Sequence, residues 1–204
     1  DSQLARLLGF LARSGRLDRT LVVVTGDNGQ AFMEHGCSGH AGPLFEEVVR
    51  VPLIIHGPGI APRDVFSLAE HVDVPPTVLG LLGLPPFPGF QGDDLLARGD
   101  DQAFLVVQTP RANQVALVEG RYKLIYDVTG GRYHLFDLAV DAAERDDLAE
   151  REPFLRRRLA GRLQTWLDAQ LEYYTKGARQ GHVSRFPPVV VPSPTEGEGV
   201  LRAN

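Results

Sequence analysis

The sequence predicts an α/β fold in the first half of the chain, followed by a small four-stranded antiparallel sheet with a C-terminal helix. The first indication is the apolar run Leu21–Val24, which lacks alternation, as is typical of a strand covered on both faces in a parallel sheet between helices. The second is a series of short strand-like segments between residues 103 and 136, with no helix between them. The third is a long helical stripe of leucines after residue 152.

The first half is expected to alternate helices with strands. Leucines recur at helical spacing in Asp1–Ser14, and Gly15 ends this helix. Val51–Ile55 is a second apolar run, which we expect in the same sheet as the strand that begins at Leu21. Two prolines suit the first turn of a later helix. The remaining helices of this half are expected at residues 45–50 and Thr77–Leu82.

The second half is expected to be an antiparallel meander covered by one helix. Glycine turns at Glu119-Gly120 and Thr129–Gly131 separate the strands. The helix, from about Glu152 to Thr175, carries its leucines and Trp166 on one stripe and should pack across the sheet. The four strands are expected at Ala103–Val107, Gln114–Val118, Tyr122–Tyr126 and Tyr133–Phe136.

Composition divides the chain into three parts. Residues 1–100 are expected to form part of an α/β domain and residues 101–178 a subdomain made of the antiparallel sheet and the long helix. Residues 179–204 are rich in proline and poor in patterned apolar residues, so an extended tail is expected.

Charge and cysteine content exclude several classes of protein. The formal charge is −5 without a basic stripe, so nucleic acid is not an expected partner. No apolar run approaches the length of a membrane span, and no signal-peptide pattern is present, which leaves the compartment open. Cys37 is the single cysteine, so an internal disulfide framework and a multi-cysteine zinc site are excluded.

Asp27 and Asn28 form the first candidate site, directly after the strand that begins at Leu21. In open α/β sheets, ligands gather beyond the carboxyl ends of strands. A carboxylate and an amide oxygen are hard donors of the kind that Ca²⁺ or Mg²⁺ takes, although Ca²⁺ needs roughly six to eight oxygens, so other ligands must come from elsewhere. The alternative is an ordinary Asn-Gly turn capped by Asp27.

His35 and His40 lie on the loop that leaves the same strand end. Either imidazole could contact an anionic substrate or donate a proton to a leaving group, and the alternative is a solvated loop histidine. Cys37 between them is either a free thiol or a nucleophile with one of these histidines as its base.

Two further charged groups have competing interpretations. The acidic and basic residues of 46–50 form either a charged helix face or an internal ion pair, of which the ion pair is favoured. His71 and Asp73 suggest a metal site, but a helix cap at Asp73 is the favoured role.

Several segments, in order, resemble those of the sulfatase family of the alkaline phosphatase superfamily. Thr25–Gly29 resembles the metal-binding turn of that family. Leu44–Ile55 resembles a later segment of the family, which ends in a strand. The other matching segments are Glu34–Gly36, His71–Thr77, Leu81–Gly83, Tyr122–Ile125, Leu135–Leu138 and Asp141–Leu148. The series covers about residues 1–177.

The resemblance implies an alkaline-phosphatase-like αβα sandwich, present here in part, ahead of the small sheet. It also implies that Asp27 and Asn28 bind a divalent cation, usually Ca²⁺, with Mg²⁺ or Mn²⁺ as alternatives, beside the sulfate ester of a small molecule or glycan. Phosphodiester and phosphonate relatives often have Asp-His there, so Asn28 favours a sulfatase. His40 stands where many members have a sulfate-contacting lysine, and His40 and His35 are the expected catalytic residues.

The resemblance also implies that these residues correspond to the C-terminal half of the family. The nucleophile motif C/S-x-P-x-R, whose first residue matures to formylglycine in sulfatases, is absent, and the segment at Cys37 does not match it. The expectation is therefore the C-terminal portion of a metal-dependent sulfatase, with the nucleophile supplied by the N-terminal half of the same enzyme. The alternatives are a phosphodiesterase, phosphonate hydrolase or transferase of the superfamily, and a non-catalytic binding module.

Overall fold

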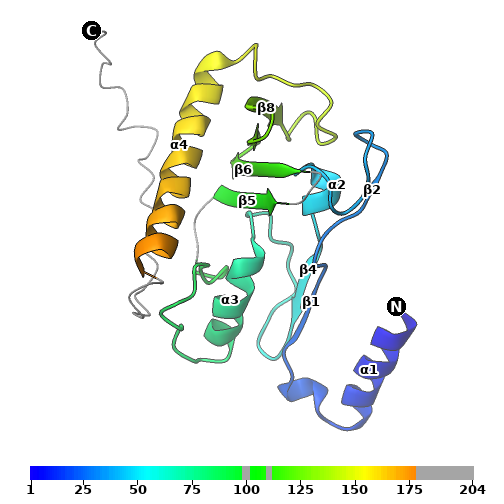
Figure 1. Ribbon diagram of the computed structural model, residues 1–204. Helices are drawn as coiled ribbons and strands as arrows, with labels where there is room; N and C mark the ends of the chain where they lie inside the picture. The colour runs from blue at the N-terminus through cyan, green and yellow to red at the C-terminus, as the bar shows by residue number, and fades with distance from the viewer. Residues whose placement is uncertain (98–101, 109–111, 178–204) are drawn as a thin grey trace. The chain divides into compact units, whose positions relative to one another are not determined.

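The computed structural model describes residues 1–97, 102–108 and 112–177 (Figure 1). The chain divides into two compact units, Asp1–Phe66 with Thr109–Ala112, and Ser67–Gln108 with Asn113–Asn204. The domain boundary predicted near residue 100 stays a prediction, and the predicted tail 179–204 lies outside the described residues.

The first unit contains two helices, one 3₁₀ turn and four short strands. The predicted N-terminal helix is confirmed, and Gly15 beyond its end has a φ of 64°, which favours glycine. This helix buries none of its residues, and its Leu7 is 54% exposed. The elements are α1 (Ser2–Arg13), a 3₁₀ turn (Leu17–Arg19), β1 (Val22–Thr25), β2 (Ala31–Phe32), β3 (Ser38–Gly39), α2 (Glu46–Val49) and β4 (Leu53–His56).

Strands β1 and β4 form one two-stranded sheet, as predicted, but their direction differs from the prediction. They pair antiparallel, from Val22 opposite His56 to Thr25 opposite Leu53. The parallel arrangement was wrong for this pair because an uninterrupted apolar run says nothing about strand direction. A parallel connection needs a crossover of a dozen or more residues, usually a helix, whereas α2 has four residues. Among the described residues β1 and β4 have no other strand partner, and β1 is half-buried rather than buried.

The second unit is built on the predicted antiparallel meander. Its strands pair in chain order, and each neighbouring pair is antiparallel. The turns after Glu119 and Thr129 contain Gly120 and Gly131 at positive φ, as the glycines predicted. The elements are a 3₁₀ turn (His71–Asp73), α3 (Val74–Leu81), β5 (Gln102–Gln108), β6 (Asn113–Glu119), β7 (Tyr122–Asp127), β8 (Arg132–Asp137), α4 (Pro153–Glu172) and a π-helical turn (Tyr173–Gly177).

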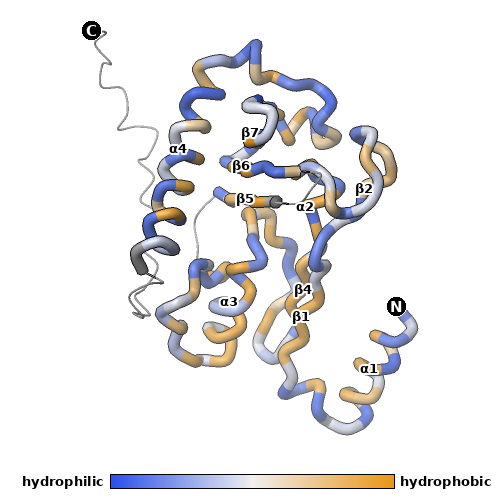
Figure 2. Tube along the Cα trace, in the orientation of Figure 1, coloured by the Kyte–Doolittle hydropathy of each residue, from blue (hydrophilic) through white to orange (hydrophobic). Residues whose placement is uncertain are grey.

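Helix α4 packs against the β5–β8 sheet, as predicted. The Phe104 ring of β5 stacks on Trp166 of α4, with centroids 4.7 Å apart and planes 3° apart. Apolar and polar residues alternate along this helix in Figure 2, as expected for a helix with one covered face. The buried residues of this core are Val115, Leu117, Leu124, Leu135, Ala149, Leu159 and Leu163.

Helix α3 begins at Val74, three residues before the predicted start. Its first turn includes two prolines, whose missing N–H groups have no partner in a first turn anyway. The expected cap by Asp73 is wrong for this helix, since its side chain makes no capping bond to α3. The buried Asp73 carboxylate instead accepts hydrogen bonds from the amides of Glu70 and Asp93, both at 2.9 Å, and so closes the preceding 3₁₀ turn onto a later loop.

Two ion pairs cross the core of the second unit. Lys123 Nζ lies 2.9 Å from Glu144 Oε1, and both side chains are fully buried. Arg162 of α4 places Nε 2.7 Å from Glu119 Oε2 at the end of β6. The first pair joins the sheet to the loop that follows β8, and the second joins the sheet to α4. None of the described helices is both long and apolar enough to span a membrane.

Candidate metal and substrate site

The turn after β1 is held against α2 through Gly29. Its amide donates to the Val48 carbonyl at 2.7 Å. A Cβ at this position would lie 2.2 Å from the Glu47 carbonyl oxygen, a distance that no side chain tolerates. Glycine is therefore required here by close backbone approach rather than by a positive φ, and the approach fixes where the preceding two residues sit.

Asp27 and Asn28 are both exposed at the carboxyl end of β1. The Asp27 Oδ1 accepts a hydrogen bond from the Asn28 amide at 3.0 Å, and Asn28 Nδ2 donates to the Gly29 carbonyl at 2.7 Å. These contacts fix the amide nitrogen of Asn28 inside the turn, so its Oδ1 is the atom available for a ligand. The same bonds would form in a plain Asn-Gly turn, so both interpretations of the motif share this geometry.

His35 is a packed residue rather than a solvated loop histidine. Its Nδ1 lies 2.7 Å from Glu47 Oε1 of α2, and both side chains are about 15% exposed. Its ring stacks on Phe45 with centroids 3.7 Å apart and planes 8° apart. A carboxylate only accepts, so Nδ1 carries the proton, and in the neutral form of the ring Nε2 is the acceptor. Glu47 is thus paired with His35, and the ion pair predicted among the charged residues of 46–50 stays a prediction.

His40 is exposed directly after β3, which pairs with β2 through Ala31 opposite Gly39. Its side chain makes no hydrogen bond or ion pair with another residue of the described ranges. The structure thus fixes the backbone on which His40 sits without fixing its imidazole. Cys37 on the same hairpin is a half-buried free thiol.

The two candidate ligands have the right chemistry for a hard metal ion, but they are too few to complete its coordination. Asp27 and Asn28 supply hard oxygens, but within the described part of the chain no three His, Cys, Asp or Glu residues gather as a metal site. The same finding applies to His71 and Asp73, of which the second is buried and bonded to backbone amides.

Glu47 is the site residue whose role the sequence did not assign. Its contact with His35 spans a glycine-rich loop, and such a loop has no periodicity from which a contact could be predicted. The sequence features that could have indicated this contact are an acidic pair on a short helix and a histidine on a nearby loop.

The chain has an alkaline-phosphatase-like fold, as solved neighbours show. The chain resembles a structure described as BT4656 in complex with its substrate D-glucosamine-2-N,6-O-disulfate, with a TM-score of 0.73 at 22% identity over 89% of this chain and 40% of the other. It resembles the phosphonate monoester hydrolase of Agrobacterium radiobacter with a TM-score of 0.68 at 25% identity, over 83% and 39% of the two chains.

The family follows from sequence comparison, in which the Sulfatase family model matches residues 1–84. The chain is 31% identical to arylsulfatase K of Mus musculus over 172 residues, covering 75% of this chain and 31% of that protein. It is 32% identical to the choline-sulfatase of Rhizobium meliloti (strain 1021) over 160 residues, covering 74% and 31%. The chain belongs to the sulfatase family of the alkaline phosphatase superfamily. It spans about a third of the length of these curated relatives.

Proposed function

We propose that the chain is the C-terminal portion of a metal-dependent sulfatase that hydrolyses sulfate esters. The observation that carries the proposal is the exposed Asp27-Asn28 pair at the end of β1, inside the segment that the family model matches. Two oxygen ligands at a strand end suit one side of a cation site, and the remaining ligands and the nucleophile would come from the N-terminal part of the same enzyme.

Each residue of the site has a separate role in this proposal. Asp27 and Asn28 hold a divalent cation, Ca²⁺ before Mg²⁺ or Mn²⁺, because both offer hard oxygens. The bound cation supplies electrostatic stabilisation of the charge that develops on the sulfate oxygens. His40 contacts the sulfate group or protonates the leaving oxygen, and its lack of a fixed partner leaves it able to turn toward a substrate. His35 presents Nε2 from a ring held by Glu47 and Phe45.

The substrate is proposed to be a sulfated small molecule or glycan. The relatives include proteins named for aryl and choline sulfates, and one solved neighbour is described with a disulfated glucosamine as its substrate. The second candidate is a phosphodiester or phosphonate hydrolase, favoured by the likeness to a phosphonate monoester hydrolase. Asn28 tilts the choice toward sulfate, because amide oxygen suits Ca²⁺ whereas imidazole suits softer cations.

The test is hydrolysis by the natural polypeptide that carries these residues, assayed on one aryl sulfate, one aryl phosphate diester and one aryl phosphonate. We expect sulfate hydrolysis that a chelator abolishes and Ca²⁺ restores, and we expect Asp27→Asn to lower activity at least a hundredfold by weakening the cation site. Asp18→Asn, an exposed aspartate of the preceding 3₁₀ turn, is the matched control.

Preference for the phosphonate or the diester would move the assignment to the second candidate. Activity that is equal in Asp27→Asn and Asp18→Asn would overturn the metal role of Asp27. A natural polypeptide that neither binds a cation nor hydrolyses any of the three esters would make the chain a binding module that retains the fold.

A further inference from the structure

A polar pocket lies in the second unit of the chain, between β8 and the beginning of α4. Its volume is about 650 Å³. One wall is Gly131–His134, and the other walls come from the loop before α4 and from the first two turns of that helix. The charged and titratable side chains that line it are Arg132, Tyr133, His134, Asp147, Glu150, Arg156 and Arg157. The site proposed above uses none of them.

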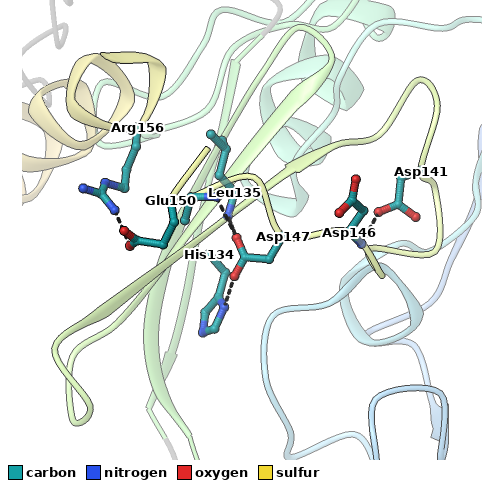
Figure 3. Close-up of polar contacts among 8 residues, drawn as sticks. His134, Leu135, Asp141, Asp146, Asp147, Glu150 and Arg156 are labelled. Carbon is teal, nitrogen blue, oxygen red and sulfur yellow. Dashed lines mark hydrogen bonds and ion pairs between the residues drawn. The ribbon is translucent and has the colours of Figure 1, made fainter. Parts of the chain in front are cut away.

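The two acidic groups of this pocket are already engaged (Figure 3). Asp147 Oδ2 lies 2.8 Å from His134 Nδ1, and its Oδ1 accepts hydrogen bonds from the amides of Leu135 and Ala149. Glu150 Oε1 accepts a hydrogen bond from Arg156 Nη1 at 2.7 Å. The bond to Asp147 also fixes the His134 tautomer, with the proton on Nδ1.

Two guanidinium groups of the pocket form no ion pair within the part of the chain that the structure describes. Neither Arg132 nor Arg157 forms an ion pair with another residue of the described ranges. Asp127 faces Arg132 across the β7–β8 register; its Oδ1 accepts from the amides of Thr129 and Gly130, and its Oδ2, although nearby, makes no ion pair with the Arg132 guanidinium. Arg157 lies over the Phe154 ring at 4.9 Å, a contact that uses the face of the guanidinium and leaves its edge donors available.

The position of the arginines on α4 supports a ligand of negative charge. The positive end of a helix dipole favours anions, yet the first turn of α4 contains no acidic residue and ends at Arg156, with Arg157 next. Glu152 at the N-cap and the Glu150 partner of Arg156 supply negative charge here, whereas Arg157 forms no ion pair with another described residue and is left to interact with a bound anion. Guanidinium groups from two different walls match the several oxygens of a tetrahedral oxyanion.

We propose that this pocket binds a tetrahedral oxyanion, a sulfate or phosphate group, between Arg132 of β8 and Arg157 of α4. His134 lines the same space, so its ring resonances report occupancy. The proposal does not rest on the sulfatase assignment, because it uses neither Asp27 nor Asn28 and requires no hydrolysis. The anion is either a free ion or the charged group of a larger ligand such as a sulfated sugar.

The test is a titration of the 204-residue chain with sodium sulfate and sodium phosphate, followed by NMR of the His134 ring at ionic strength held constant with chloride. We expect saturable shifts with either oxyanion. Arg132→Gln and Arg157→Gln should each weaken binding about tenfold, the loss expected for one charged hydrogen-bonding partner. Arg151→Gln, whose guanidinium pairs with Asp146 outside the pocket, should bind as the unaltered chain does.

The possible results distinguish failure of the proposal from the identity of the ligand. Absence of a saturable shift beyond that of chloride, equal affinity in all three variants, or equal binding of acetate would overturn the proposal. Tighter binding of a monosaccharide sulfate than of free sulfate would assign the anion to a glycan ligand, and equal affinities would assign it to the free ion. A chain that fails this test could still be a sulfatase, since the ester assay uses the other unit.

Discussion

The carboxylate of Glu47 determines how His35 can act. It holds Nδ1 at 2.7 Å, so the imidazole has one orientation and one neutral tautomer. This is a positioning role, exerted through another residue. It is also separable from packing, because the ring stack on Phe45 does not involve the carboxylate.

Replacing Glu47 should therefore change the tautomer of His35 before it changes the fold. In Glu47→Ala we expect the Nδ1–H form to lose its predominance, and the chain to lose about 1–2 kcal/mol of unfolding free energy from a charge-assisted hydrogen bond. Long-range ¹H–¹⁵N spectra of the ring and urea unfolding measure the two effects. Glu47→Gln retains a carbonyl acceptor and should keep the Nδ1–H form. If Glu47→Ala leaves the ring spectrum unchanged, the positioning role is wrong.

The Lys123–Glu144 pair is the residue contact with the largest expected effect on stability. Both side chains are fully buried, so removal of one leaves a charge without its partner inside the core. We expect Lys123→Met to lower the free energy of unfolding by about 3–5 kcal/mol. The double variant Lys123→Met/Glu144→Gln should recover a large part of this loss, because it buries no charge. Equal instability of the single and double variants in chemical denaturation would contradict this account.

At the scale of elements, the β1 turn and α2 are joined by backbone approach. Gly29→Ala places a methyl group against the Glu47 carbonyl and should cost about 1–3 kcal/mol, the usual range for forced overpacking. Gly42→Ala in the same unit meets only the Cys37 Cβ at 3.7 Å and should cost little. Thermal unfolding of the pair measures the difference. If both variants melt at the same temperature, the turn is not held against α2 as described.

The loop before α4 is attached to β8 through Asp147, and this attachment should weaken in acid. Partial burial acts to raise the pKa of Asp147, but hydrogen bonds from Leu135, Ala149 and His134 outweigh it and lower the pKa below its ordinary value. A carboxylate with a depressed pKa in the folded state contributes stability above its unfolded pKa of about 3.9 and loses it as pH falls through the folded pKa.

Asp147→Asn should therefore be less stable than the unaltered chain at neutral pH, and the gap should close as pH falls below about 4. Urea unfolding across pH 2–7 measures the gap. The exposed neighbour in Asp146→Asn loses only a surface pair with Arg151, so its stability should stay close to that of the unaltered chain at each pH. A gap that is independent of pH would contradict the role of the Asp147 carboxylate.

The sequence predicts those features of this structure that depend on residues close together in the chain, and it fails for those that depend on residues far apart. The meander, its glycine turns and α4 were predicted, because strands that are neighbours in the chain pair with each other and the leucine stripe is local to one helix. The antiparallel direction of β4 relative to β1 was not predicted, because the pattern of apolar residues indicates burial and not strand direction. In the candidate site, the Asp27-Asn28 turn follows from its own strand, whereas the His35–Glu47 contact depends on the path of a loop without periodicity.

At the scale of the whole chain, the two units differ in how much they bury. The largest fully buried apolar side chains, Leu117, Leu124, Ile125, Leu135, Leu159 and Leu163, all lie in the second unit, whereas α1 of the first unit buries none of its residues. Hydrogen exchange followed by mass spectrometry should thus find the slowest amides in β6, β7 and the middle of α4, and the fastest described helical amides in α1. Equal protection of α1 and α4 would show that α1 is covered in solution.

The chain-order pairing of β5, β6, β7 and β8 also has a kinetic consequence. Each hairpin closes a short loop, so the loss of loop entropy before the first favourable contact is small. A sheet of such low contact order forms sooner than one that needs distant segments to meet. The meander is thus suited to be the folding nucleus on which α4 condenses, while β1 and β4, separated by β2, β3 and α2, pair later.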